Sequence, residues 1–540
     1  MTDIEIPYAK DRKGHYRFFE ILPGVLSYSM ILLPLVLSLI NVTFAAIFIL
    51  IYLLINFTRA GAGAIRSLHG YRSLRKYQKL DWRQFVEELD AGEVADPKAL
   101  RPKWHYDNLL RLSVKPMVVK PGEVLHAIII ATYNEAREVL EPTIQSVIDS
   151  DYDMKKVILV IAYEERGGER VKKQSQELIK DYKHHFYAAM AVEHPDNIPG
   201  EVIGKGGNVT YAGRELQKWL EKKDIDPVRV VVTTLDSDNR PDKKYLAALT
   251  YVYSSCPDPV RASFQPIAMY TNNIWDAPAP MRVLATGNSF FHITQSMRPH
   301  MLRNFSAHAQ GMASLIKTDF WSVRTIVEDG HQYWRAFFAF EGDYRVYPVY
   351  VPIYQDAVLT EKYTKTLKAQ FIQLRRWTYG ASDIAYVVDK GFFKKNKIPR
   401  FALWSRTFRL MEGHVTWASG PILVSLAGFI PSLIHPQSLA ANELPLIVSR
   451  IQTIALAFGI PALFICLKTL PPKPERYKRH RSLFMVLQWA YLPVTTIVYN
   501  SFAAFYSQTR LMFGRYMDKF DVTAKAVVTT NESGETVTKI

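Results

Sequence analysis

The chain has 540 residues, of which 48% are hydrophobic and 22% are charged, and its formal net charge is +16 at pH 7. This length accommodates more than one domain, and the composition is typical of a membrane anchor joined to a soluble domain. The charge does not indicate a nucleic acid partner, because Lys and Arg crowd beside uncharged spans, near 10–17, 59–76 and 473–481. Such flanks are typical of cytoplasmic segments that meet anionic lipid headgroups. Cys256 and Cys466 are too few for a disulfide framework or a cysteine metal cluster.

Residues 21–57 carry no charge, whereas one membrane-crossing helix needs about 20 apolar residues. The stretch predicts a hairpin of two helices that turns near Asn41, with both basic flanks in the cytoplasm; one long, tilted helix is the alternative. Three later apolar spans lie at 415–434, 446–468 and 483–507. The last span either crosses once, which leaves the basic tail outside, or re-enters at Pro493.

These spans divide the chain into seven expected regions. They are a basic N-terminus (1–17), a transmembrane hairpin (18–58), a linker (59–122), an α/β domain (123–384), an interfacial amphipathic segment (385–414), a C-terminal transmembrane region (415–509) and a tail (510–540). We expect an integral membrane protein whose residues 60–410 are cytoplasmic, because basic flanks lie on both sides of this part of the chain.

Three nearly continuous apolar runs, rich in β-branched residues, predict buried parallel strands at Leu125–Thr132, Val157–Ala162 and Val228–Leu235. Helical periodicity lies between them, with Pro142 expected in the first turn of one helix and Asn208 as the N-cap of the next. The alternation predicts an α/β fold, a Rossmann-like and mostly parallel sheet. Its ligands are expected beyond the carboxyl ends of the strands.

Asp236 and Asp238 close the third strand, and side chains at i and i+2 of an extended chain point to the same side. Two convergent carboxylates suit a divalent cation, Mg²⁺ or Mn²⁺, which would bridge a donor diphosphate. The alternative is a turn that precedes a helix. Lys205, before a glycine pair and a helical segment, favours phosphate, although a flexible turn is an equally good interpretation.

Glu328 and Asp329 form an acidic pair suited to general-base catalysis, with a solvated turn as the alternative. Gln373, Arg376 and Trp377 share one helix face at i, i+3 and i+4. An amide, a planar cation and a large aromatic ring suit a diphosphate beside a sugar ring. A helix at the membrane surface is the other interpretation.

In this order, the motifs resemble those of processive family 2 glycosyltransferases, the group of cellulose, hyaluronan and chitin synthases, over about residues 125–380. The resemblance implies a GT-A catalytic fold flanked by membrane helices, and inverting transfer from a nucleotide-diphosphate sugar to a growing glycan. It assigns the metal to Asp236 and Asp238, the base to Asp329 beside Glu328, and donor diphosphate and acceptor contacts to Gln373, Arg376 and Trp377. Donor binding is assigned to Tyr133, Asn134, Glu135, Lys205, Gly206, Asn208 and Asp236.

One departure lies after the second strand, where the family usually carries an aspartate and this chain has Glu164. We assign Glu164 to the donor site, and the nucleotide base stays open. Residues 520–525 are similar to the cytoplasmic segment that follows the last membrane helix of cellulose synthases. That similarity favours re-entry of the span 483–507.

Two other functions are compatible with the sequence. A non-processive enzyme would have the same donor site and would load a polyprenyl phosphate or another lipid acceptor. A catalytically inactive membrane scaffold or transporter is less well supported, because all the catalytic-type residues are present and the apolar spans carry almost no charge.

Overall fold

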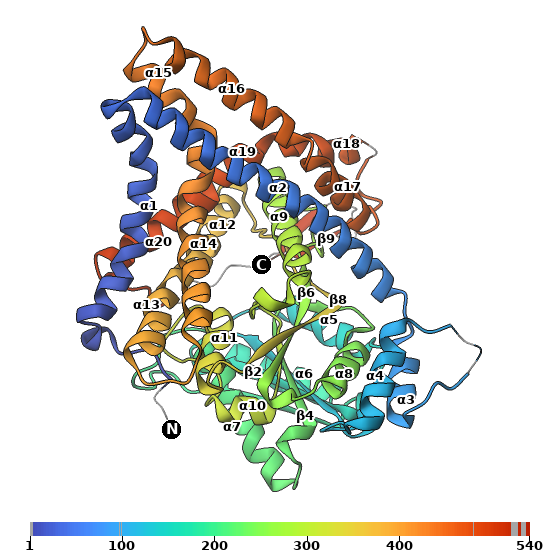
Figure 1. The fold of residues 1–540 in the computed structure, drawn as a ribbon. Helices are drawn as coiled ribbons and strands as arrows, with labels where there is room; N and C mark the ends of the chain where they lie inside the picture. The colour runs from blue at the N-terminus through green and yellow to red at the C-terminus, as the bar shows by residue number, and fades with distance from the viewer. Residues whose placement is uncertain are drawn as a thin grey trace.

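The computed structural model describes residues 4–96, 98, 100–478 and 480–519, together with the short strands 527–530 and 536–539. It contains a mixed α/β domain and a layer of long apolar helices above it (Figure 1). Residues 520–525, whose similarity to a cytoplasmic segment was noted from the sequence, lie outside the described residues.

The domain is built on an eight-stranded sheet in the order β3-β2-β1-β4-β7-β6-β8-β5. Strands β1 to β4 are parallel to one another, β7 is antiparallel to β4 and β6, and β6 is parallel to β8. The bounds are β1 Leu125–Thr132, β2 Val157–Glu164, β3 Ala188–His194, β4 Val230–Asp236, β5 Arg240–Pro241, β6 Ala262–Met269, β7 Ala309–Gly311 and β8 Arg345–Tyr354. The α/β fold class is confirmed, and so are the three predicted strands. The third begins two residues late because 227–229 form a 3-10 turn.

Helices cover both faces of the sheet (Figure 1). Those of the domain are α5 Arg137–Ile148, α6 Gly168–Tyr182, α7 Lys205–Lys222, α8 Tyr245–Ser255, α9 Ala279–Ser296, α10 Met312–Lys317, α11 Glu328–Ala339, α12 Tyr363–Thr378 and α13 Asp383–Val388, preceded by α3 Trp82–Ala91 and α4 Lys103–Val114. Two expected helix starts are wrong. Pro142 lies inside α5, and Gly204, rather than Asn208, is the N-cap of α7.

Within the described residues, five helices are long and apolar enough to cross a membrane. They are Gly14–Ile40 (α1), Val42–Gln78 (α2), Arg400–Ile434 (α14 Arg400–Leu426 and α15 Ile430–Ile434), Leu439–Thr469 (α16 Leu439–Leu456 and α17 Gly459–Thr469) and His480–Met512 (α18 His480–Leu487, α19 Leu492–Thr495 and α20 Phe502–Met512). The first two meet at Asn41, where the turn was predicted, and the Asn41 side chain accepts a hydrogen bond from the backbone N–H of Thr43 at 2.8 Å. His435, directly after α15, places Nε2 2.7 Å from the carbonyl oxygen of Ser38 near the end of α1. The ends of α1 and α15 therefore lie side by side.

The last apolar helix does not turn back at Pro493. Proline at the start of a helical segment needs no hydrogen-bond donor, and the chain continues through 3-10, α and π turns to Met512. Both ends of this helix contact the α/β domain. Arg481 donates to the carbonyl of Trp275 at 2.7 Å, and just beyond the other end the N–H of Met517 donates to the Tyr379 hydroxyl at 3.2 Å. The residues after α20 therefore begin on the side of the domain.

A charged clasp joins the start of α1 to the end of α20. Arg17 donates to the carbonyls of Leu511 and Met512, each at 2.6 Å, and it pairs with Glu20 at 2.9 Å. Here α1 approaches α20 so closely that a Cβ on Gly24 would lie 2.3 Å from Met512 Sδ. The clasp fixes one end of the groove described below.

Candidate active site

Residues from three predicted motifs meet at the carboxyl end of β4. Lys205, the first residue of α7, places Nζ 2.9 Å from Asp236 Oδ1, 3.2 Å from Asp329 Oδ2 and 3.8 Å from Glu328 Oε1. Asp236 ends β4, whereas Glu328 and Asp329 begin α11. We refer to these four residues as the carboxylate cluster. It lies where a doubly wound sheet places its ligands.

The surroundings of the cluster shift the pKa values of two of its members, Lys205 and Glu328. Burial alone would lower the pKa of Lys205, but the carboxylates of Asp236, Asp329 and Glu328 raise it, so the ammonium stays charged. Burial, followed by the charge of Asp329, raises the pKa of Glu328 well above its ordinary value. Burial and the neighbouring charge therefore favour the protonated form of Glu328 beside Asp329.

His308 borders the Asp329 carboxylate, with Nδ1 3.8 Å from Asp329 Oδ1. Burial lowers the pKa of His308, so this contact is not an ion pair at neutral pH. Nδ1 lies 3.0 Å from the carbonyl of Phe305, to which it donates, while Nε2 accepts from Trp321 Nε1 at 3.4 Å. The two partners fix one tautomer, and the ring acts as a neutral wall beside the candidate base.

Asp236 and Asp238 have the ligand chemistry of a divalent cation site. Ser306 donates to Asp236 Oδ2 at 2.8 Å, and the N–H of Asp356 donates to Asp238 Oδ2 at 3.2 Å. Within the described residues there is no group of three or more His, Cys, Asp or Glu able to hold a metal ion. Mg²⁺ in phosphate-handling sites uses one or two carboxylates together with substrate oxygens. The pair therefore fits a cation that is also bound by the oxygens of a diphosphate. The Lys205 ammonium beside Asp236 offsets part of the negative charge of these carboxylates.

The loops after β1 and β2 form a second group. Arg166 lies 4.6 Å from the centroid of the Tyr133 ring and makes an ion pair with Glu164. The Glu135 carboxylate accepts from the N–H groups of Tyr133 and Asn134, at 2.8 and 3.2 Å. Sequence reasoning missed Arg166. Tyr133 and Glu164 thus come together through it, while Glu135 shapes the loop.

Asn208 and Gly206 hold the start of α7 in place. Asn208 Nδ2 donates to the carbonyl of Ala162, at the end of β2, at 2.9 Å. A Cβ on Gly206 would lie 2.4 Å from the carbonyl oxygen of Ser322, so only glycine fits there. Both residues were expected to bind the donor. That assignment stays a prediction. The contacts of Asn208 and the restricted space around Gly206 fix the first turn of α7, which begins with Lys205.

The helix α12 reaches the cluster through an aromatic residue that sequence reasoning missed. The Trp377 and Tyr270 rings lie 6.1 Å apart. Burial raises the pKa of Tyr270, and the negative charges of Asp236, Asp238 and Asp329 raise it further. On the same helix face, Gln373 accepts from Gln370 at 3.1 Å, and Arg376 is buried.

A short segment before α1 also packs beside the site. Residues 4–8, which we call the N-terminal strap, place Ile6 in a core cluster with Tyr333 and Phe337 of α11. Glu5 pairs with the buried Arg335 of α11 at 2.7 Å, and Tyr386 donates to the carbonyl of Ile4 at 2.7 Å. The strap therefore supports the helix that begins with Glu328 and Asp329. Five residues carry no periodicity, so this contact could not be predicted from the sequence.

No protein-family model matches this chain, and no curated protein matches it. Among solved structures it is similar to the mannosyltransferase PcManGT from Pyrobaculum calidifontis in complex with GDP-Man and Mn²⁺. The identity is 15%, the coverage is 82% of this chain and 98% of that chain, and the TM-score is 0.41. It is also similar to S. aureus TarS 1–349, with 11% identity, coverage of 76% and 98%, and a TM-score of 0.36. These values are too low to assign a family or an activity.

Proposed function

We propose that the chain is a membrane glycosyltransferase that moves a sugar from a nucleotide-diphosphate donor onto a growing glycan with inversion at the anomeric carbon. The observation that carries the proposal is the carboxylate cluster, in which Lys205 joins Asp236 to Asp329. A cation-binding carboxylate and a candidate base, from motifs about 90 residues apart, lie around one ammonium at the carboxyl end of the sheet. The resemblance of the ordered motifs to processive family 2 enzymes supports the same proposal.

In this proposal Asp329 is the general base. The acceptor hydroxyl attacks the anomeric carbon, the bond from that carbon to the diphosphate oxygen breaks, and Asp329 takes the hydroxyl proton. The raised pKa of Glu328 favours its protonated form, so Glu328 does not compete with Asp329 for the proton. Lys205 stays charged and holds Asp329 in place from 3.2 Å.

Asp236 and Asp238 would hold a Mg²⁺ or Mn²⁺ ion in this proposal. A bound cation would offset the charge of the departing nucleotide diphosphate. Tyr133 and Glu164, gathered by Arg166, are proposed to face the nucleotide, and Gln373, Arg376 and Trp377 to face the diphosphate and the acceptor sugar. Tyr270 supports the last assignment because it contacts Trp377 and its pKa responds to the charges of Asp236, Asp238 and Asp329.

The experiment that tests the activity uses purified full-length protein and a panel of labelled nucleotide-diphosphate sugars, with product sizing. We expect one donor to give a long polymer, and excess chelator to stop transfer until Mg²⁺ or Mn²⁺ is restored. Short products that extract into organic solvent would instead indicate a lipid acceptor. No transfer from any donor, with a folded protein, would contradict the proposal.

We also propose that the α/β domain is cytoplasmic, because the basic residues flanking the apolar helices lie on its side. A cysteine introduced at the exposed Glu169 should not react with an impermeant thiol reagent in intact cells, and should react once the membrane is opened. Cys256 and Cys466 are buried and give a low background. Labelling of intact cells would place the domain outside.

A further inference from the structure

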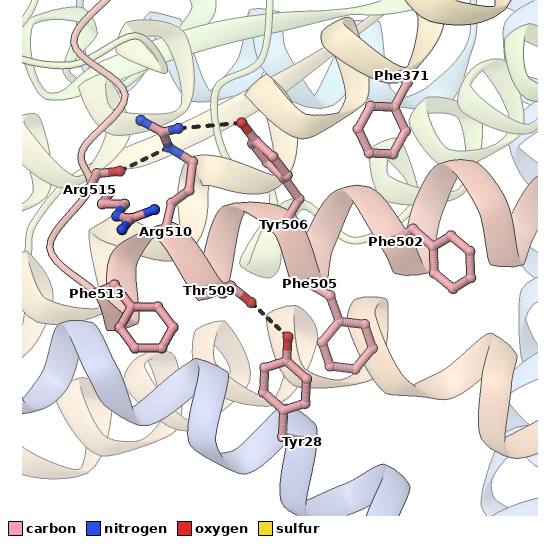
Figure 2. Close-up of a pocket in the computed structure, with 9 residues that line it drawn as sticks. All are labelled: Tyr28, Phe371, Phe502, Phe505, Tyr506, Thr509, Arg510, Phe513 and Arg515. Carbon is pink, nitrogen blue, oxygen red and sulfur yellow. Dashed lines mark hydrogen bonds between the residues drawn. The ribbon is translucent and has the colours of Figure 1, made fainter.

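A cavity of about 560 Å³ opens on the helix layer, away from the carboxylate cluster. We call it the aromatic groove, and Figure 2 shows its lining residues. They come from α1, α12, α20 and the residues just after α20, and they are Tyr28, Phe371, Phe502, Phe505, Tyr506, Thr509, Arg510, Phe513 and Arg515. Neither the motifs nor the proposed reaction uses this surface.

The groove has an apolar body. Six of its nine lining residues are Phe or Tyr, and the rings of Tyr28 and Phe505 lie 4.8 Å apart. Phe502 and Phe513 are 50% and 71% exposed, although both belong to the apolar helix layer or its end. Large aromatic rings left open on such a surface favour contact with lipid rather than with water.

The polar groups in the groove are already engaged with one another. The Tyr28 hydroxyl and Thr509 Oγ1 lie 2.7 Å apart in a hydrogen bond, and Arg510 donates to the Tyr506 hydroxyl at 3.4 Å. A glycan needs many hydrogen-bond partners for its hydroxyls, whereas a hydrocarbon chain needs none. This contrast favours a chain over a sugar as the occupant.

The charged groups gather at one end. Figure 2 shows Arg510 and Arg515 at the end opposite Phe502 and Phe371. Arg510 donates to the carbonyls of Arg515 and Tyr516, at 2.9 and 3.0 Å, which holds this backbone at the end of the groove. The Arg510 guanidinium is therefore engaged within the chain, whereas Arg515 is exposed. None of the lining residues is acidic, and the nearby Glu20 is buried by Arg12, Arg17 and Tyr516. This end of the groove is therefore positively charged, and no acidic lining residue neutralises it.

The length of the groove agrees with a lipid. Phe502 and Phe513 are separated by 11 residues, or roughly 16 Å along a helix at 1.5 Å per residue. An acyl chain that fills one leaflet, about half of the ~30 Å hydrocarbon core of a bilayer, is long enough to cover this distance. A single chain with its headgroup at the arginines would extend over the rings to Phe502.

We propose that the aromatic groove binds one anionic phospholipid of the surrounding bilayer, with its phosphate at the exposed Arg515, beside the positive charge of Arg510, and an acyl chain over the aromatic rings. The site is independent of the proposed reaction. It still touches the catalytic part of the chain, because Phe371 lies on α12, the helix that carries Gln373, Arg376 and Trp377. Arg375 of the same helix lies 5.3 Å from the centroid of the Tyr506 ring.

Native mass spectrometry of the purified full-length protein tests the proposal. The protein is exchanged into phosphatidylglycerol or into phosphatidylcholine with the same acyl chains, and retained lipid is counted. We expect one phosphatidylglycerol to be retained in preference to phosphatidylcholine. Arg515→Gln should weaken that retention roughly fivefold, the usual effect of one basic residue at an anionic membrane surface. Inorganic phosphate, which lacks a chain, should not displace the lipid.

Two variants sharpen the test. Arg409→Gln removes another exposed arginine beside the helix layer, on α14, and should retain phosphatidylglycerol as the unmodified protein does. Phe502→Ala shortens the apolar end and should also weaken retention. Equal retention of the two lipids by the unmodified protein would overturn the proposal, and so would unchanged retention in both Arg515→Gln and Phe502→Ala. Displacement by millimolar inorganic phosphate would instead indicate an anion site without a lipid, and would also overturn it.

Discussion

The carboxylate cluster and the aromatic groove both contain basic side chains. The basic side chain of the cluster is buried among carboxylates, whereas the groove has an exposed one beside aromatic rings. Lys205 is only 8% exposed and lies within 3.8 Å of three carboxylates. Arg515, in contrast, lies on the surface beside aromatic rings. When a buried charge is removed, its partners stay buried without an opposite charge, which destabilises the fold. When an exposed charge is removed, water solvates its partners and the cost is small. Substitutions in the cluster should therefore have large effects on folding and turnover, and those in the groove small ones.

The largest effect is expected from Asp329→Asn, which keeps the shape of the base and removes its proton acceptor. Turnover should fall by roughly two to four orders of magnitude, the usual worth of a general base. Donor affinity should change little, because the interaction is made in the transition state. Steady-state kinetics and calorimetric donor binding measure the two. Asp343→Asn, at an exposed pair with Arg261, is the control. A normal rate in Asp329→Asn would move the base elsewhere.

Lys205→Met tests the buried charge directly. It leaves Asp236 and Asp329 facing each other without their cation, and breaking such a buried pair typically costs about 3–5 kcal/mol. We expect a clear drop in the midpoint of thermal unfolding in detergent. Lys218→Met, on the exposed face of the same helix, should change the midpoint little. Equal midpoints for the two variants would mean that the cluster does not depend on its lysine.

The protonation of Glu328 predicts a pH dependence. Burial, followed by the Asp329 charge, raises the pKa of Glu328 to about 8, from an ordinary value of 4.5. Between these two values the folded protein keeps a proton that the unfolded chain releases. Stability should therefore fall as the pH rises from about 4.5, by at most about 1.4 kcal/mol per pH unit, and this contribution should level off above about 8. Glu328→Gln cannot release the proton and should flatten the unfolding midpoint between pH 5.5 and 8. Parallel profiles for both proteins would contradict this.

The smallest effect is expected at the open side of the groove. Phe513 is 71% exposed, so Phe513→Ala should change the stability of the lipid-free protein in detergent by no more than about 0.5 kcal/mol. Phe337→Ala in α11 removes a fully buried ring and should cost about 3–5 kcal/mol. A large loss in Phe513→Ala would show that the groove wall is part of the protein core, which removes the contrast between the two regions.

Three of the four parallel strands, β1, β2 and β4, could be predicted because they are continuous apolar runs, buried on both faces. Strand β3 was not predicted, since most of its residues are only partly buried and its sequence ends in Glu193 and His194. The other half of the sheet, β5 to β8, could not be predicted. Strand β6 contains Pro266, and β8 contains Pro348 and Pro352, residues that argue against an interior strand. The structure accommodates Pro266 at a register shift between β6 and β8. Such irregularities depend on the neighbouring strand and leave no pattern in the sequence.

The contacts within the candidate site could not be predicted from the sequence either. The motif residues were found one motif at a time, because a strand end or a helix start is a local feature. The contacts among them depend on how the elements pack. Lys205 was expected to face phosphate, yet its nearest partners are carboxylates from β4 and α11. Tyr270 and His308 belong to no motif, and only the folded chain places them beside the acids.

The N-terminal strap sets an order on biosynthesis. Glu5 is made before α1 and α2, but its partner Arg335 lies 330 residues further along the chain. At about 5–20 residues per second, translation of that interval takes roughly 15–70 s. During this time the two apolar helices can already leave the ribosome for the membrane, while the strap has nothing to bind. Its docking therefore waits until α11 has been made, and a bulky fusion placed directly before Ile4 would interfere with this contact.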